Sequence, residues 1–327
     1  MSLPVNNQEP VKRKQKTPQG ISALAKDVYL GFKFAIENFL SYFLAMLGIV
    51  LLTIIMLLVV LLFIVVPLII FVGIPTILHW AATFSVEVGT LEGTMFIGII
   101  LLFVLPILGP FFIALGSLYG MSREIVEGEE TTAESAFSWY KKRALSLAGG
   151  GIIHFLVSIL PFLLAIFMLF TTQAAPPTNE ELGVILPLGF IWILLSNGIL
   201  CLTFPGIIDG LSAASAAKRS VLLCCRSPGR VLGSWVVYAS LIGVPIITLI
   251  DDPLFNWIQI IPDSYMEPYT IVIILLLLFV ILPAMSITFT RIYLILTAQA
   301  ESVYDNDDNT EDGYTIRLEV DYNEPKE

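Results

Sequence analysis

The chain has 327 residues, of which 57% are apolar and only 13% are charged. Soluble domains carry about 25% charged residues, so this composition excludes an ordinary water-soluble protein. The formal net charge of −10 is uneven, because residues 301–327 hold ten acids against Arg317 and Lys326.

The chain begins with a polar, basic segment. Residues 1–20 contain Lys12, Arg13, Lys14 and Lys16 and few apolar residues, which predicts a disordered arm. Over 21–39, apolar residues then recur at helical spacing between charged ones. This pattern predicts an amphipathic helix on the inner surface of the membrane.

Six continuous apolar stretches follow, each long enough to cross a membrane as a helix, which takes about 20 residues. Continuous runs favour helices over barrel strands, in which apolar and polar residues alternate. The spans are expected at about 43–66, 94–118, 149–171, 184–207, 231–250 and 270–294. The predicted fold is therefore an all-α integral membrane protein, with a six-span domain over residues 21–300.

Pro67 and Pro75 interrupt the apolar stretch that follows the first span. If 67–80 crossed the membrane completely, every later loop would be inverted. We therefore expect this segment to re-enter the membrane or to lie in the outer leaflet, and the sequence leaves both open.

Two more amphipathic helices are expected between the spans. Thr131-x-x-Glu134 matches a capping box and predicts that a helix starts there. A third helix is expected at about 212–225, with alanines on one side and Lys218 and Arg219 on the other. Three times, then, an amphipathic helix precedes a hairpin of two spans, which predicts an internal repeat with units starting near 21, 131 and 211.

After the last span, residues 301–327 are acidic and poor in apolar residues, so we expect a disordered tail. Within it, residues 314–322 alternate apolar and polar side chains. That alternation is also typical of a strand added to a protein partner. Binding of a partner through the acidic tail is the alternative to a purely solubilising role.

The 17 Lys and Arg residues fall into four groups separated by the spans and by three connections that lack them. Basic residues are retained in cytoplasmic loops. The pattern predicts a multi-pass protein of the plasma (cell) membrane with both termini in the cytoplasm. Its expected partners are the lipid bilayer and anionic lipid headgroups, to which basic surface residues are attracted; no nucleic acid is expected.

The spans contain almost no ionisable residues, so the few near their ends are the candidate site. Arg291 lies near the end of the sixth span, Asp209 just after the fourth, and Glu124 just after the second. A cluster of these three would be a structural clamp or an anion-binding site for lipid headgroups. No nucleotide, metal or nucleophile motif is found, so we expect no catalytic residues, cofactor or metal, and His154 is expected to be a packing residue.

The segment from Phe204 to Leu223, followed by Gly229–Trp235, resembles an element of uncharacterised prokaryotic membrane proteins. These include the membrane domain attached to some glycerophosphodiester phosphodiesterases and related domains of unknown function. Residues 122–143 resemble a second copy. The resemblance implies a membrane domain without known catalysis, since a phosphodiesterase barrel alone takes about 250 residues.

The sequence thus favours a non-enzymatic membrane protein with a scaffold, accessory or envelope-homeostasis role. The alternative is a transporter or lipid-handling protein with a cavity that opens to the cytoplasm near Asp209, Glu124 and Arg291.

Overall fold

The computed structural model describes residues 21–76, 79, 91–129, 131–172, 179–247 and 266–304. Every regular element among these residues is helical, which confirms the all-α prediction. The predicted arm at 1–20 and the tail beyond Tyr304 lie outside the described residues, as does the end of the fifth predicted span at 248–250.

The helices follow one another along the chain with few interruptions. They are α1 (Ile21–Glu37), α2 (Phe39–Val72), α4 (Leu91–Glu127), α5 (Ala133–His154), α6 (Leu160–Thr172), α7 (Asn179–Leu200), α8 (Thr203–Ile208), α9 (Ala213–Arg226), α10 (Pro228–Ile247), α11 (Met266–Leu276) and α12 (Leu282–Tyr304). Two π-helical turns, η1 (Phe155–Ile159) and η4 (Leu277–Ile281), join α5 to α6 and α11 to α12.

Four helical stretches of the described chain are long and apolar enough to span a membrane. They are Phe39–Phe63, Ala133–Ile166, Val184–Ile208 and Pro268–Gln299. These stretches support the prediction of a membrane protein. The other two predicted spans, 94–118 and 231–250, fall on helices α4 and α10, so the count of six spans stays a prediction.

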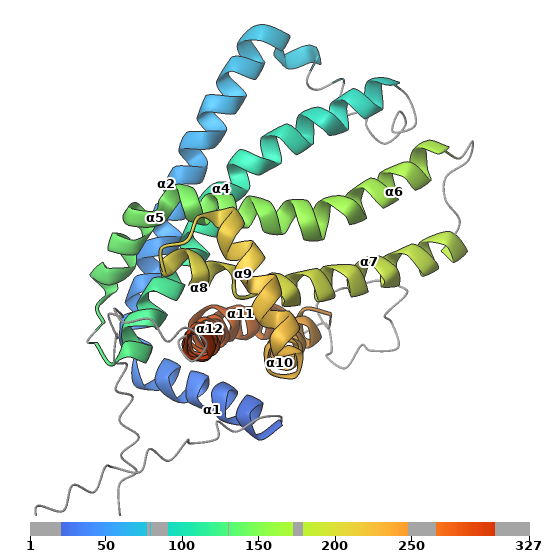
Figure 1. Ribbon diagram of the computed structural model, residues 1–327. Helices are drawn as coiled ribbons and strands as arrows, with labels where there is room; N and C mark the ends of the chain where they lie inside the picture. The colour runs from blue at the N-terminus through green and yellow to red at the C-terminus, as the bar shows by residue number, and fades with distance from the viewer. Residues whose placement is uncertain are drawn as a thin grey trace, which may run out of the picture.

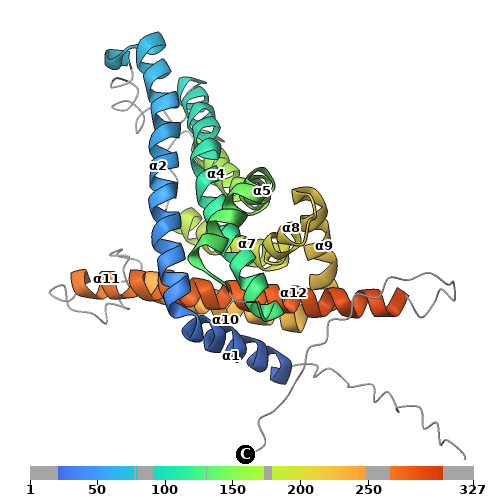
Figure 2. The same cartoon turned by 90° about the vertical axis from the view of Figure 1, so that its left-hand side faces the viewer.

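The long helices lie in three neighbouring pairs that diverge from a shared base (Figures 1 and 2). Helix α2 runs beside α4, α6 beside α7, and α10 beside α12. Away from the base, α2 exposes Leu47, Leu51, Ile54 and Leu58. A helix that is apolar on all sides and exposed suits a lipid environment better than water.

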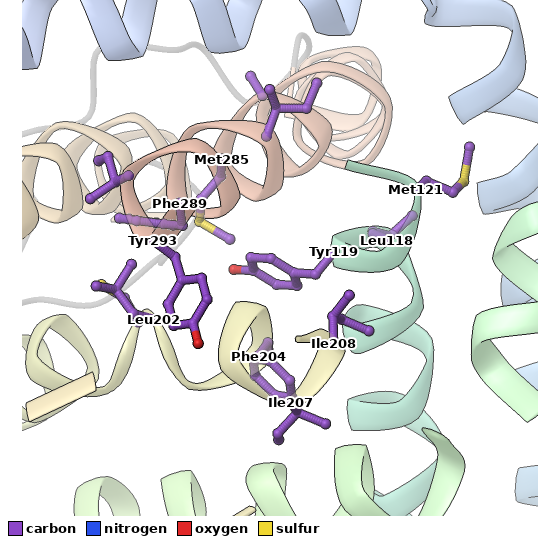
Figure 3. Close-up of a cluster of buried hydrophobic side chains, with 14 of the residues drawn as sticks. Leu118, Tyr119, Met121, Leu202, Phe204, Ile207, Ile208, Met285, Phe289 and Tyr293 are labelled. Atoms are coloured by element: carbon purple, nitrogen blue, oxygen red, sulfur yellow. The ribbon is translucent and has the colours of Figure 1, made fainter. Parts of the chain in front are cut away.

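The packed core lies at the base, where α4, α8 and α12 meet. We call these the inner helices. Figure 3 shows Tyr119 of α4, Phe204 of α8 and Phe289 and Tyr293 of α12 gathered in one cluster of buried side chains. The rings of Tyr119 and Phe204 are stacked at 5.6 Å between centroids. The base is thus the part of the molecule with a core like that of a soluble protein.

Three stretches, which run from α1 into α2, along α5, and from α9 into α10, are buried at positions of identical spacing. The three series are Gly31, Ala35, Tyr42, Ala45 and Ile49; Ala136, Tyr140, Leu147, Gly150 and His154; and Ser220, Cys224, Val231, Ser234 and Tyr238. All fifteen residues are buried, with no insertion or deletion between the series.

Each of α1, α5 and α9 packs on a different inner helix, α1 on α12, α5 on α4 and α9 on α8. Two of these contacts need glycine. A Cβ on Gly31 would lie 2.0 Å from Thr288 Oγ1 of α12, and one on Gly120 of α4 would lie 2.3 Å from the Trp139 ring of α5. Because α1 packs on α12, the first described helix and the last are adjacent and the base forms a closed ring of helices.

Three helix boundaries differ from the sequence prediction. Helix α2 passes through Pro67 and ends at Val72, and it is followed by the C-cap residue Gly73, whose φ of 83° is readily adopted only by glycine. The capping-box prediction was wrong, because Thr132 is the N-cap of α5 and the Thr131 hydroxyl donates to Glu124 instead. Helix α12 continues to Tyr304, four residues into the predicted tail.

Candidate functional site

Asp209 connects all three inner helices. It follows α8 directly, and its two carboxylate oxygens accept hydrogen bonds from the other two inner helices. Arg123 Nη1 of α4 donates to Asp209 Oδ1 at 2.9 Å, and the Tyr293 hydroxyl of α12 donates to Oδ2 at 3.0 Å. This junction, Arg123–Asp209–Tyr293, connects the ends of α4 and α8 to the middle of α12.

The Asp209 junction is partly open to solvent, since the side chains of Arg123 and Asp209 are each 25% exposed. A second carboxylate, Glu127, accepts from Arg123 Nε at 3.0 Å. On the other side, the Arg219 guanidinium lies 5.7 Å from the centre of the Tyr293 ring. Solvent screening limits the contribution of such an ion pair to stability to about 1 kcal/mol or less. The junction therefore orients the helices relative to one another but adds little to the stability of the fold.

A second ionic group is far more buried. Asp27 of α1 is only 1% exposed. Its Oδ2 accepts from Arg230 Nε of α10 at 2.5 Å, and its Oδ1 accepts from Arg230 Nη2 at 2.9 Å and from Arg291 Nε of α12 at 3.2 Å. This group, which we call the Asp27 triad, joins three helices that are remote in sequence.

The Asp27 triad holds α1, α10 and α12 together through buried charge. Moving charges out of water costs several kcal/mol per ion, and only good geometry with multiple hydrogen bonds offsets that cost. Arg230 supplies the planar two-point contact that matches a carboxylate. Because each partner is needed to compensate the others, removal of one member should destabilise the base.

Glu124 is held within a polar pocket between α4 and α5. One carboxylate oxygen accepts from Thr131 Oγ1 at 2.9 Å and from the Ser135 hydroxyl, and the other accepts from Trp139 Nε1 at 2.7 Å. Three donors thus satisfy both oxygens of this carboxylate. Glu124 thus fixes the start of α5 to the end of α4.

The three residues of the predicted cluster are distributed over the three inner helices, Glu124 near the end of α4, Asp209 just after α8 and Arg291 within α12, and each has partners of its own. Arg291 pairs with Asp27, Asp209 with Arg123 and Tyr293, and Glu124 with the start of α5. The groups that meet at the centre are Asp209, Arg123 and Tyr293. Arg123 directly precedes Glu124, and Tyr293 lies two residues after Arg291.

Sequence reasoning missed Asp27 and Arg230. The amphipathic pattern over 21–39 predicts that its charged residues, Asp27 among them, face solvent, whereas the structure buries Asp27. The signal was present, because Ala23, Asp27, Gly31 and Ala35 recur every four residues and form one stripe of α1. A carboxylate in a stripe of small residues points to a buried partner.

Uncharged hydroxyl groups extend the contacts between the helices. The Tyr42 hydroxyl lies 2.8 Å from Ser122 Oγ, which lies 2.7 Å from Ser286 Oγ, so that α2, α4 and α12 are connected. His154 is buried, with Nδ1 3.0 Å from the Gly150 carbonyl oxygen and its ring stacked on Phe204. These contacts agree with the packing role expected for His154.

Asp27, Asp209 and Glu124 are thus all engaged by donors from the protein itself, and each of these three carboxylates connects different helices. No family model, curated protein or solved structure matches the chain. The contacts of Asp27, Asp209 and Glu124 at the base are therefore the evidence that bears on function.

Proposed function

We propose that the protein is a non-enzymatic scaffold of the plasma membrane, with six spans and both termini in the cytoplasm. The observation that carries the proposal is the use of the charged groups near the span ends. Asp27, Asp209 and Glu124 all hold helices together through protein donors. A rigid base with apolar arms is what a scaffold or accessory subunit requires.

In this proposal the chain is a threefold repeat. Each unit has a helix at the inner membrane surface followed by a hairpin of two spans, and the support is the identical spacing of the three buried series. The ring of contacts, α1 on α12, α5 on α4 and α9 on α8, gives each unit the same neighbour relation. The resemblance to the phosphodiesterase-attached membrane domain is part of the proposal and brings no activity with it.

The base faces the cytoplasm in the proposed orientation. Its exposed basic residues, among them Lys141, Lys142 and Lys218, would then lie at the anionic inner leaflet. Each basic residue near such a surface contributes about 1 kcal/mol of attraction. The scaffold would bind the inner surface of the membrane through this face.

The decisive experiment compares stability with transport in the same variants. In Asp27→Asn, two guanidinium groups lose their carboxylate, and we expect a loss of about 3–5 kcal/mol in the free energy of unfolding. For Arg291→Ala the expected loss is smaller, about 1.5–3 kcal/mol, because Arg230 still pairs with Asp27. Thermal unfolding of the detergent-purified chain measures both.

Lys33→Ala is the matched control. Lys33 lies on the same helix as Asp27 and forms only an exposed pair with Glu37 at 3.8 Å. Its removal should change stability by less than about 0.5 kcal/mol. If Arg291→Ala kept wild-type stability yet abolished a lipid-transfer or solute flux measured in proteoliposomes, the scaffold proposal would fail and a transport function would replace it.

A further inference from the structure

Arg143 of α5 lies beside the connection between α8 and α9. Its Nη2 is 3.4 Å from the point where a Cβ would stand on Gly210, whose φ of 105° is a glycine conformation. Six residues further along α5, a Cβ on Gly149 would stand 3.2 Å from that of Ala213. Residues 210–213 therefore run alongside α5, with the Arg143 guanidinium at their start.

The positive charge of Arg143 is not compensated within the described part of the chain. Its Nε is buried and has no hydrogen-bond partner there. The adjacent carboxylate, Asp209, already accepts from Arg123 and Tyr293 with both oxygens. An unpaired guanidinium of this kind is stabilised by an anion from outside the described chain.

The rim of this site supplies hydrogen-bond donors. Gly210, Ser212 and Ser215 are exposed, and the two serine hydroxyls lie 3.0 Å apart. Ser212 caps α9 by accepting from the amide of Ser215. The first amides of a helix have no acceptor within it, so the N-terminus of α9, three residues after Gly210, offers further donors and a partial positive charge.

The charge of Arg143 is not required by the fold. In the three series of buried positions, the residues at the place of Arg143 are Asn38 and Ser227, both neutral. Asn38 donates to the Phe34 carbonyl at 3.0 Å, and Ser227 is the C-cap of α9. Of the three series, only the second places a cation at this point, beside the turn that leads into α9.

We propose that Arg143, together with the exposed turn from Gly210 to Ser215, binds a phosphate group. A planar guanidinium contacts two phosphate oxygens at once, and hydroxyls and helix N-terminal amides complete the set. The phosphate belongs either to a lipid headgroup or to a free phosphate ion.

This site gives the proposed scaffold a specific ligand. The inference rests on the proposed function in one respect only, namely which side of the membrane the site faces. The test uses the full chain in detergent with two lipids of identical acyl chains. Phosphatidic acid carries the phosphate and diacylglycerol lacks it. Native mass spectrometry counts the bound lipids, and a titration gives the affinity.

Wild type should bind one phosphatidic acid more tightly than diacylglycerol. Arg143→Gln should weaken this binding by about tenfold or more, since it removes a charged two-point contact. Arg226→Gln is the matched control, with the same substitution at an exposed arginine in the last turn of α9, and should weaken it by less than about twofold. Equal weakening in both variants, or none in either, would overturn the site.

Competition with inorganic phosphate, against chloride at equal ionic strength, separates the two sources. Displacement of the lipid identifies a site that free phosphate fills, and no displacement identifies a headgroup site. If Arg143→Gln fails to fold, Arg143→Lys replaces it. That variant keeps the charge but loses the planar fork, so affinity should fall by about threefold or more, and wild-type affinity would refute the proposal.

Discussion

At the scale of single residues, Asp27 determines how α1 docks. It is the one charged member of a stripe whose other residues are alanine and glycine, and both of its oxygens are engaged. Sliding α1 by one turn, about 5.4 Å, would remove the carboxylate from Arg230 and Arg291 and leave three buried charges apart. The triad therefore selects one register of a helix whose small residues alone would permit several.

The adjacent thiols Cys224 and Cys225 should differ in reactivity. Burial, and to a lesser extent the neighbouring Cys225, raises the pKa of the Cys224 thiol, whereas Cys225 is exposed. Only the thiolate reacts, so at pH 8 we expect iodoacetamide to modify Cys224 about tenfold or more slowly than Cys225. Alkylation rates of two variants, each retaining one of these cysteines and no other, measure the difference.

The pH dependence of Cys224 has a definite sign. A thiol whose pKa is raised by folding favours the folded state below the pKa of the unfolded chain. This contribution is lost as the pH rises through the higher folded value. The alkylation rate of Cys224 should therefore keep rising above pH 9, and in SDS the two thiols should react alike; equal rates in the folded protein would contradict the prediction.

Single residues were only partly predictable from the sequence. Arg291, Asp209 and Glu124 were identifiable because charge is rare near the span ends. Their partners were not, since Asp27 lies more than 260 positions before Arg291 and nothing local announces the pairing. Arg143 was predicted only as one of a group of basic residues, because its isolation from carboxylates depends on how α5 meets the turn at Gly210.

At the scale of helices, α1 and α12 should separate when Gly31 gains a side chain. A Cβ there would lie 2.0 Å from Thr288 Oγ1 and 2.8 Å from the Ala284 carbonyl oxygen, and the latter is backbone that cannot rotate away. Gly31→Ala should therefore destabilise the chain by about 1–3 kcal/mol, despite the higher helix propensity of alanine. Thermal unfolding and trypsin cleavage after Lys33 measure the separation.

Gly243→Ala provides the control for Gly31→Ala. Gly243 lies inside α10 with open space around its Cβ position, so alanine should be neutral there or stabilise by up to about 1 kcal/mol. If both variants had equal stability and equal trypsin sensitivity, close packing of α1 on α12 would be refuted.

Helix positions were more predictable than helix contacts. Apolar periodicity predicted α1 and α9 to within a few residues of their observed bounds, Ile21–Glu37 and Ala213–Arg226. The capping box failed because Glu124, seven residues before Thr131, competes for its hydroxyl. The packing of α1 on α12 was not predictable, because hydrophobic periodicity says which face is buried and not which helix covers it.

At the scale of the whole molecule, composition alone was sufficient for the all-α class, since apolar runs of this length form helices in lipid. The divergence of the helix pairs from one base (Figure 2) was not predictable. Hydropathy gives the length of a span but not its tilt, which packing at the base determines. The long span Pro268–Gln299 has 32 residues, or about 48 Å at 1.5 Å per residue, which suits a strongly tilted helix.

The six-span topology can be tested with introduced cysteines. In a chain whose three native cysteines are serine, a single cysteine replaces Glu87, Thr178 or Asp263, which lie in the connections without Lys or Arg, outside the described residues. Because these connections are expected outside the cell, a membrane-impermeant maleimide should label all three in intact cells. Lys141→Cys, exposed on α5 at the base, should be labelled only after permeabilisation.

Position 87 is the most informative of these sites, because it follows the segment with Pro67 and Pro75. A full crossing at 67–80 would place residue 87 in the cytoplasm and invert every later connection, so that 178 and 263 would also be protected while Lys141→Cys would react. That reversed pattern would contradict the six-span topology and move the base to the outer face. It would leave the Asp27 triad and the Arg143 site intact in geometry, but the latter would then meet only phosphate groups of the outer leaflet or of the exterior.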